Sequence, residues 1–214
     1  MSHSYFISDL HLHAARPAIT RALADFLASH RDCDALYILG DLFEAWIGDD
    51  DDSAIAHEVT GLLRAFSAAG PTLYLMQGNR DFLLGEAFAA AAGATLIADP
   101  TVIDLYGTAT LLLHGDSLCT GDTEYMAFRQ QARDPAWQAQ LLAQSLGQRR
   151  ELARNLRTMS AETNSNKAED IMDVTPAEVV REMQRAGVRQ MIHGHTHRPA
   201  RHDEPSGVRW VLGD

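Results

Sequence analysis

The chain has 214 residues, of which 46% are hydrophobic and 22% are charged. This composition is typical of a globular protein and excludes collagen-like, low-complexity and disordered chains. The formal net charge of −11 disfavours a nucleic-acid-binding protein, which needs a basic surface to neutralise phosphates. Two cysteines, Cys33 and Cys119, are too few for a disulfide framework, and neither a secretory signal nor a membrane-spanning run is present. We therefore expect a soluble protein of a reducing compartment.

Short apolar runs alternate with helical patterns along the chain. Short apolar runs bounded by Gly and Asp are typical of buried strands, whereas Leu, Ala and Phe at helical spacing indicate helices. In chain order, the predicted elements are a strand at 5–8, a helix at 17–30, a strand at Ala35–Leu39, a helix at 53–69, a strand at Thr72–Met76, a helix at 82–92, and strands at 109–113 and 190–192. This alternation predicts an α/β layered fold.

Residues 121–175 break the alternation, because they contain helical patterns and no convincing strand. Asp134 and Pro135 predict the start of a helix, and Gly147 predicts an interruption. Beyond Gly147, apolar and basic side chains fall on opposite faces at a period of about 3.6 residues. The apolar face holds Leu152, Leu156 and Met159, and the basic face holds Arg150, Arg154 and Arg157. We interpret 121–175 as a helical insertion over the active face of one domain, 1–214.

Each of the five predicted strands is followed by side chains that can bind metals. In chain order, these are Asp9 and His11, Asp41, Asn79, His114, and the run of His193, His195 and His197. Loops at the carboxyl ends of strands are where layered folds place ligands. In an extended chain, residues i and i+2 point the same way, so Asp9 and His11 could reach one ion. Mixed nitrogen and oxygen ligands suit Mn²⁺, Fe²⁺ or Zn²⁺.

Each of these motifs by itself has a simpler explanation. An Asp-x-His pair occurs often by chance, a Gly-Asp pair after a strand is usually a turn, and a single histidine is more often structural than a ligand. Their shared position at strand ends, in this order, is what indicates a metal site.

The ordered motifs D-x-H, G-D, G-N-x-D, H and G-H-x-H resemble those of the calcineurin-like metallophosphoesterase superfamily. This resemblance implies a two-sheet β-sandwich flanked by helices. Longer strings resemble the UDP-2,3-diacylglucosamine hydrolase family of lipid A synthesis. They are GDLFEAWIGDD at 40–50, GNRDFL at 78–83, NSNK at 164–167, IMDV at 171–174 and HGHTHRP at 193–199.

The resemblance implies two divalent metal ions, usually manganese. The first metal would be held by Asp9, His11 and His197, the second by Asn79, His114 and His195, and Asp41 would bridge them. His193 is not a ligand position in the family, so we expect it to be structural. His13 follows the first pair and departs from the general pattern.

Arg80 occupies a position where the wider superfamily commonly has a histidine. An arginine cannot give up its proton at neutral pH, so we interpret Arg80 as a fixed cation that stabilises phosphoryl charge. A phosphate leaving group tolerates this, because its second pKa is about 6. The alternative is that Arg80 pairs with Asp81 or Asp116 and only orders the loop.

The reaction implied by the resemblance is attack of a metal-bound hydroxide on the α-phosphorus of UDP-2,3-diacylglucosamine. The products would be UMP and 2,3-diacylglucosamine 1-phosphate, which is lipid X. Asp41 and Arg80 would be catalytic. The substrate contacts implied are Asn79, Arg80, Asp122, Ser160, Asn164, Lys167 and His195. Lys167 is the only lysine in the chain, and the alternative for 160–167 is a solvated loop.

The helical insertion could roof a chamber for two acyl chains. The apolar residues available for the roof are Trp137, Leu141, Leu142, Leu146, Leu152, Leu156 and Met159. The basic face could meet anionic lipid headgroups, or it could be the solvated face of an ordinary amphipathic helix. From the resemblance we expect a monomer in the cytoplasm, in peripheral contact with the inner membrane.

The chain ends at Asp214, where family members continue for about one strand, so we expect an exposed sheet edge. A metallophosphoesterase acting on soluble nucleotides or phosphoesters is an alternative function, which would need no apolar roof. A scaffold without chemistry is a further alternative, although it has no reason to keep seven metal ligands.

Overall fold

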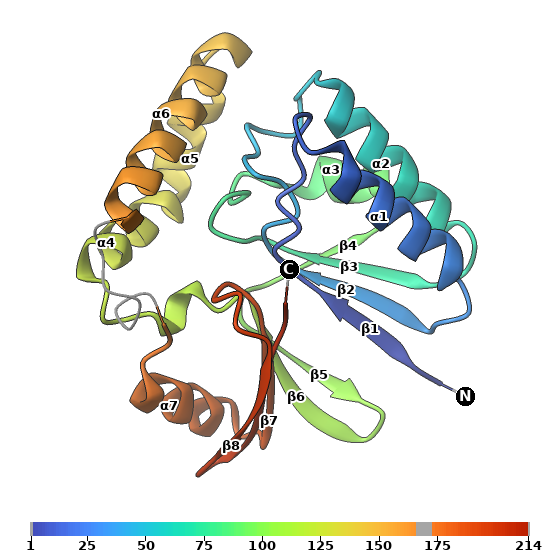
Figure 1. The fold of residues 1–214 in the computed structure, drawn as a ribbon, viewed down its shortest axis with the longest axis vertical. Coiled ribbons are helices and arrows are strands. Elements are labelled where there is room, and N and C mark those ends of the chain that lie inside the picture. The colour runs from blue at the N-terminus through green and yellow to red at the C-terminus, as the bar shows by residue number, and fades with distance from the viewer. Residues whose placement is uncertain (1, 166–172, 214) are drawn as a thin grey trace.

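Two β-sheets form the centre of the protein (Figure 1). The computed structural model describes residues 2–165 and 173–213, apart from the side chains of 161–165. The first sheet is parallel and contains, in spatial order, β1 (Ser4–Ile7), β2 (Ala35–Leu39), β3 (Thr72–Met76) and β4 (Thr95–Ile97). The second is mixed and contains, in spatial order, β5 (Thr101–Leu105), β6 (Thr108–Leu113), β7 (Gln190–His193), β9 (Gly207–Val211) and β8 (Ala200–Glu204).

Helices cover the outer faces of both sheets. They are α1 (Pro17–Ser29), α2 (Ala54–Ser67), α3 (Glu86–Ala92), α4 (Thr123–Ala132), α5 (Pro135–Leu142), α6 (Leu146–Ser165) and α7 (Pro176–Ala186). The first three lie on the first sheet, and α7 lies on the second, whereas α4, α5 and α6 stand at one side of the sandwich (Figure 1). The two-sheet sandwich flanked by helices is therefore confirmed.

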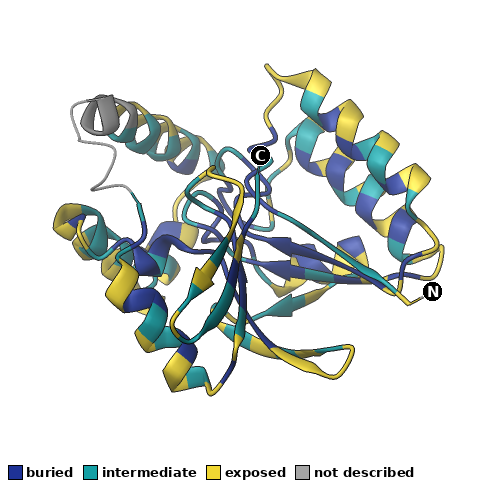
Figure 2. Ribbon diagram, turned by 60° about the horizontal axis from the view of Figure 1, so that its bottom comes forward, coloured by how far each residue is buried: buried dark blue, intermediate teal, exposed yellow. Residues whose placement is uncertain are grey.

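The strands alternate between two buried faces. In β2, Leu36 and Ile38 pack in the core under α1, α2 and α3, whereas Tyr37 and Leu39 pack between the sheets. In β6, Leu112 faces the first sheet in the same way. Figure 2 shows the central strands buried, and helices such as α1 and α2 are buried along one stripe. Because both faces are covered, such strands are continuous apolar runs in the sequence, which is why they were predictable.

The strand register brings the functional loops to one end of the sandwich. Leu39 at the end of β2 lies beside Met76 at the end of β3, and Leu113 of β6 lies beside His193 of β7. The segments that follow these four strands therefore emerge at neighbouring points. Five candidate ligands lie in these segments, and Asp9 and His11 follow β1, whose last residue Ile7 lies beside Ile38 of β2.

The elements missed by the sequence analysis are α7, β4, β5, β8 and β9. Strands β8 and β9 contain the charged sequences ARHDE and GVRWV, and β8 is an edge strand with exposed residues. A strand at the rim of a sheet does not need a continuous apolar run, so its pattern is weak. Within 121–165 and 173–175, the structure contains helices and no strand, as the pattern predicts.

Two predicted helix boundaries were wrong. Helix α3 begins at Glu86 rather than at 82, because the Asp49 carboxylate accepts the backbone N–H groups of Gly85 and Phe88 and fixes the start there. Gly147 does not interrupt a helix but lies in the first turn of α6. The Ser145 hydroxyl accepts from the backbone of Gln148, whose side chain accepts from Ser145 in return. This capping box starts α6.

We predict opposite effects for two glycine-to-alanine substitutions. A Cβ at Gly207, whose φ is +151°, would overlap the backbone oxygen of Arg189, which accepts the N–H of Val208. Gly207→Ala should therefore lower the free energy of unfolding by about 1–3 kcal/mol. Gly147→Ala, in open space on a helix, should raise it by about 0.5–1 kcal/mol. Urea denaturation of both variants measures these changes. A Gly207→Ala variant as stable as the unsubstituted protein would contradict the proposed steric role of Gly207.

Candidate metal centre

Hydrogen bonds join loops from both sheets at the candidate site. Backbone N–H groups of Asp9 and His11 donate to the carbonyls of Gly40 and Asp41, 3.1 and 2.9 Å away, which joins the loops after β1 and β2. The backbone N–H of His195 donates to Asp9 Oδ2 at 2.8 Å, which joins the two sheets. The structure thus brings all seven predicted metal ligands into one site.

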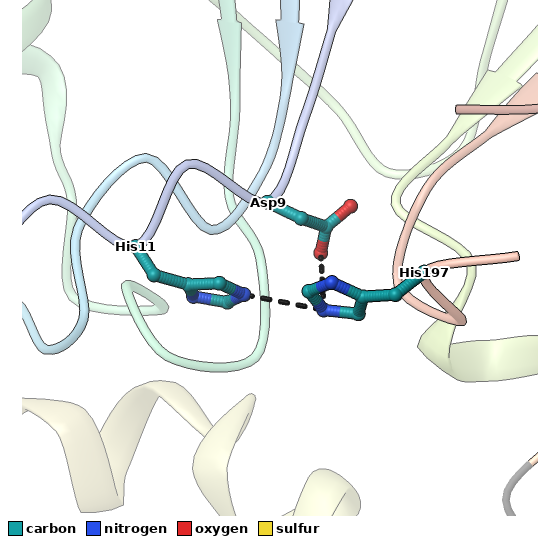
Figure 3. A group of neighbouring side chains, drawn as sticks. All are labelled: Asp9, His11 and His197. Atoms are coloured by element: carbon teal, nitrogen blue, oxygen red, sulfur yellow. Dashed lines mark hydrogen bonds and ion pairs between the residues drawn. The ribbon is translucent and has the colours of Figure 1, made fainter. Parts of the chain in front are cut away.

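The first group consists of Asp9, His11 and His197 (Figure 3). The Nε2 atoms of the two histidines lie 3.3 Å apart, and His197 Nε2 lies 3.8 Å from Asp9 Oδ1. Asp9 Oδ1 is buried, yet no described residue forms a hydrogen bond with it. Ligands about 2.0–2.2 Å from one ion are separated by about 3–3.5 Å from each other, so these atoms fit a metal.

The second group converges on the side-chain oxygen of Asn79. His114 Nε2 lies 2.9 Å and His195 Nδ1 lies 3.0 Å from Asn79 Oδ1. The other ring nitrogen of His114 donates to the Leu39 carbonyl at 2.9 Å, and this bond orients the ring. Two imidazole nitrogens and one amide oxygen are a suitable ligand set for Mn²⁺ or Zn²⁺.

Asp41 lies between the two groups. Its Oδ2 is 3.7 Å from His11 Nδ1, and its Oδ1 is 3.8 Å from His114 Nε2. The side chain is buried, and burial raises the pKa of Asp41 to about 7. Asp41 also forms a candidate metal-binding group of its own with Asp9 and His114.

The electrostatics of the site also fit divalent cations. Burial lowers the pKa of His11 to about 3 and that of His195 to about 4, so both rings are neutral with a lone pair available at pH 7. Burial alone would lower the pKa of His114 too, but the carboxylates of Asp41 and Asp9 raise it to about 9. These carboxylates therefore attract positive charge at this position, which a divalent cation would supply.

The ligand loops are not extended, contrary to the sequence-based expectation. Five of the seven residues have φ between 48° and 71°. They are Asp9, His11, Asp41, His195 and His197. Left-handed backbone is unfavourable for residues other than glycine and persists only where surrounding contacts impose it. Asp9 and His11 therefore converge through tight left-handed turns, and not through the alternation of a strand.

One buried carboxylate that is not a predicted ligand fixes two of these loops. Asp81 Oδ1 accepts the backbone N–H groups of Gly78 at 2.6 Å and Asp41 at 3.2 Å, and Oδ2 accepts those of Leu42 at 2.8 Å and Phe43 at 3.4 Å. Burial raises the pKa of Asp81, while these N–H groups oppose the rise. Gly78 lacks a Cβ, which would overlap Asp41, so the loops after β2 and β3 can touch.

Arg80 does not pair with either of the partners considered from the sequence. Its Nη1 donates to Glu44 Oε1 at 2.7 Å, and its Nε lies 3.7 Å from Asp41 Oδ2. Asp116 instead accepts from Tyr125 Oη at 2.6 Å and from Arg129 Nε at 2.9 Å. The alternative prediction, that Arg80 pairs with Asp81 or Asp116, was therefore wrong, because its partner is Glu44.

Tyr125 and Glu44 are site residues that the sequence analysis missed. The ring of Tyr125 stacks on that of His195 with centroids 6.0 Å apart, and its bond to Asp116 secures α4 against the site. No local pattern signals Tyr125, because the contact depends on how α4 packs. Glu44 lies three residues after Asp41 in the same loop, and its acidic side chain was the available signal.

A cavity of about 540 Å³ opens beside the candidate metal ligands. Its polar lining includes Asp41, Asn79, Arg80, His195 and His197. Its apolar lining, which we call the apolar chamber, includes Trp46, Ile47, Phe82, Leu83, Phe128, Leu141, Leu152, Leu156 and Met159. The volume is in the range of small-molecule sites, and the combination of candidate metal ligands with many apolar side chains suits an amphiphilic ligand.

Some of the residues predicted to form the roof or to contact the substrate line the cavity. Four roof residues line the cavity, namely Leu141, Leu152, Leu156 and Met159, whereas the described residues Trp137, Leu142 and Leu146 are not part of its lining. Asp122 and Ser160 line it, and the Asp122 carboxylate also caps α4 by accepting the N–H of Tyr125. The side chain of Asn164 and the whole of Lys167 lie outside the described residues.

Two of the three arginines predicted to form a basic face on α6, Arg150 and Arg157, form ion pairs within the protein. Arg150 pairs with Asp51 and Asp52, and Arg157 Nε donates to Glu44 Oε1 at 2.9 Å. Arg157 also lines the cavity together with Leu156, so the two are not on opposite sides of the roof. These arginines hold α6 against the acidic segment after β2. Arg154 is exposed.

The two additional histidines lie outside the candidate ligand set. His193 is fully buried, with Nδ1 bonded to the Gly194 carbonyl at 2.8 Å and Nε2 bonded to Arg209 Nη1 at 3.2 Å. Burial lowers the pKa of His193 to about 3, so it is a neutral structural residue at the strand end. His13 is exposed and accepts the N–H of Ala15. No helix in the described ranges 2–165 and 173–213 meets the length and hydropathy of a membrane span.

Two packed sheets with carboxylates, imidazoles and an amide at their strand ends define a metallophosphoesterase fold. The sequence pattern of the calcineurin-like phosphoesterase family matches residues 3–199, and the chain belongs to this family. The chain is 63% identical over 214 residues to a UDP-2,3-diacylglucosamine hydrolase of Cellvibrio japonicus, across 98% of this chain and 89% of that protein. A protein of the same name from Chromohalobacter salexigens is 57% identical over 213 residues, across 97% and 87%.

A solved structure of low sequence identity shares the fold. The phosphopantetheinyl hydrolase of Mycobacterium tuberculosis has a TM-score of 0.51 and 13% identity to this chain, across 98% of this chain and 89% of that one. This likeness concerns the arrangement of sheets and helices alone.

We predict that Asp81→Asn lowers both stability and metal binding. The new amide NH₂ group would face backbone N–H groups and leave two buried N–H donors without an acceptor. At about 1–3 kcal/mol each, this loss should lower the free energy of unfolding by about 2–6 kcal/mol. Asp104→Asn is the control, since that exposed carboxylate only accepts the N–H of Gly107. Denaturation and Mn²⁺ content are the measurements, and an Asp81→Asn variant equal to Asp104→Asn in both would contradict the role of Asp81.

Proposed function

We propose that this protein hydrolyses the pyrophosphate bond of UDP-2,3-diacylglucosamine in lipid A biosynthesis. The products are UMP and 2,3-diacylglucosamine 1-phosphate. One observation carries the proposal, namely a cavity lined both by candidate metal ligands with Arg80 and by many apolar side chains. A diphosphate linked to two acyl chains combines charged and apolar parts in the same way. The name of the relatives in Cellvibrio and Chromohalobacter supports the same substrate.

Two divalent ions, manganese in this proposal, are the cofactors. Asp9, His11 and His197 would hold the first, Asn79, His114 and His195 would hold the second, and Asp41 would serve as a ligand shared by the two. The distances between these side chains and the orphaned Asp9 Oδ1 support the assignment. When bound, two such cations supply positive charge to the phosphate oxygens and lower the pKa of water.

The protein's own side chains position the diphosphate. Arg80 stays charged and stabilises negative charge on the phosphoryl group as the bond to the leaving phosphate breaks. No protein proton donor is needed, since the leaving group is itself a stable phosphate. Asn79 and His195 border the same space from the second group. The apolar walls exclude bulk water, which strengthens the electrostatic interactions within the cavity.

The remaining proposed contacts involve the insertion and the membrane. Asp122, Ser160, Asn164 and Lys167 contact the glycolipid substrate, and the apolar chamber holds the acyl chains. The protein acts at the cytoplasmic face of the inner membrane as a peripheral monomer that does not bind nucleic acid. Leu142 and Met159, with side chains 44% and 61% exposed on the insertion, support a contact with lipid.

The first prediction compares substrates with and without acyl chains. Purified protein with Mn²⁺ should release UMP from UDP-2,3-diacylglucosamine in detergent, and excess chelator should abolish the release. UDP-N-acetylglucosamine, which cannot fill the apolar chamber, should have a kcat/KM lower by at least about 10³-fold. Mass spectrometry of UMP and the lipid product is the measurement. Equal rates on both substrates would instead favour a phosphoesterase of soluble nucleotides.

The second prediction concerns Lys167. Lys167→Ala should raise KM for the glycolipid about 10-fold or more, because a charge-assisted contact to the glucosamine phosphate is lost. It should leave hydrolysis of bis(p-nitrophenyl) phosphate, which has no sugar phosphate, within twofold of the unsubstituted protein. Steady-state kinetics on both substrates test the prediction. Equal loss on the two would show that Lys167 is not a substrate contact.

A further inference from the structure

One carboxylate, that of Glu44, joins three arginines from separate parts of the chain. Glu44 Oε2 accepts from Arg16 Nη2 at 2.6 Å, and Oε1 accepts from Arg80 Nη1 at 2.7 Å and Arg157 Nε at 2.9 Å. Arg16 precedes α1, Arg80 follows β3, and Arg157 belongs to α6. Glu44 is thus the point where the loop after β2 meets both the catalytic region and the helical insertion.

Glu44 is the hydrogen-bond partner that fixes the guanidinium of Arg80. The other carboxylate near Arg80 is that of Asp41, and its 3.7 Å distance is too long for a hydrogen bond. Among the described residues, no side chain other than Glu44 accepts a hydrogen bond from Arg80. A long side chain with several rotatable bonds would otherwise sample several orientations at the rim of the site.

Glu44 also makes the approach of α6 to this rim electrostatically favourable. Arg80 and Arg157 donate to the same Oε1 atom, so two like charges are held next to each other by one negative charge. Burial and the neighbouring Arg80 lower the pKa of Arg157, which shows that its charge is destabilised there. Without the carboxylate, Arg157 would repel Arg80, and α6 would lose its contact with the catalytic loop.

The other contacts that hold α6 to the acidic segment do not involve Arg80. Arg149 donates to both carboxylate oxygens of Asp50, at 2.7 and 2.5 Å, and Arg150 pairs with Asp51 and Asp52. These pairs lie about two turns before Arg157 on the same helix. Asp50 therefore provides a matched comparison, since it tethers the same helix without touching the phosphate-binding arginine.

We infer that Glu44 is a positioning residue, whose carboxylate orients Arg80 toward the reacting phosphate and closes α6 onto it through Arg157. The inference rests on the proposed role of Arg80 in phosphoryl transfer. Glu44 itself needs no contact with substrate. Its loss should therefore act on kcat through Arg80, and on substrate capture through α6.

The test compares Glu44→Gln with Asp50→Asn on the full chain loaded with Mn²⁺. Glu44→Gln keeps the size of the side chain but not its charge, and it should lower kcat about 10²-fold, as expected for a misplaced catalytic group. Asp50→Asn should leave kcat within twofold, although it loosens the same helix. Both variants should keep their Mn²⁺ content, which shows that the metal ligands are intact.

A double-mutant cycle separates positioning from a general structural role. Arg80→Lys keeps the positive charge but lacks the guanidinium that Glu44 orients. In the Arg80→Lys background, Glu44→Gln should lower kcat less than threefold. The inference is wrong if Glu44→Gln lowers kcat no more than Asp50→Asn does, or if its effect is equally large in both backgrounds.

Measuring every variant on two substrates keeps this inference apart from the proposed function. Bis(p-nitrophenyl) phosphate lacks acyl chains but requires stabilisation of the same phosphoryl charge. If the unsubstituted protein cleaves this diester and not UDP-2,3-diacylglucosamine, the proposed substrate is wrong while the cycle still decides the role of Glu44. If it cleaves both and the effects are simply additive, the function stands and the role of Glu44 does not.

Discussion

The candidate metal centre depends on a buried carboxylate, that of Asp81, which is not itself a candidate ligand. The Asp81 carboxylate accepts hydrogen bonds from four backbone N–H groups of the loops after β2 and β3. One of these groups is the N–H of Asp41, so the bond fixes the backbone of that residue. Buried N–H groups must be satisfied, and a single acceptor residue that serves four of them makes the two loops one rigid unit. The position of Asp41, and therefore the spacing of the two ligand groups, follows from this unit.

A rigid support is needed because the ligand residues occupy unfavourable backbone conformations. Five of the seven are left-handed, and the contacts that impose this cross from loop to loop. The His195 N–H bonded to Asp9, and the Arg80 N–H bonded to Asp41 Oδ1 at 2.8 Å, are two such contacts. Left-handed turns direct successive side chains inward at short range, which an extended strand cannot do. The strain is therefore a consequence of gathering ligands from loops that end their strands at one point.

Charge organises the protein at a larger scale in the same way. The acidic segment after β2 carries Glu44 and the aspartates at 49–52, and the arginines of α6 pair with it. Part of the negative charge of the protein therefore lies in a segment that forms ion pairs with α6. This arrangement brings apolar side chains of α6 into the same cavity as the candidate metal ligands.

The two-sheet arrangement was implied by the family resemblance. The sequence by itself determined the central buried strands and the polar side chains that follow them. It could do so because strands covered on both faces are continuous apolar runs, and because Asp9, Asp41 and His114 each follow such a run. The tertiary structure alone decided that Asp81 supports the loops, that Arg80 pairs with Glu44, and that Arg157 lines the cavity. The physical reason is that these contacts join residues distant in the chain, so no local pattern specifies them. The edge strand β8 was missed for a related reason, since a strand with an exposed face needs no apolar run.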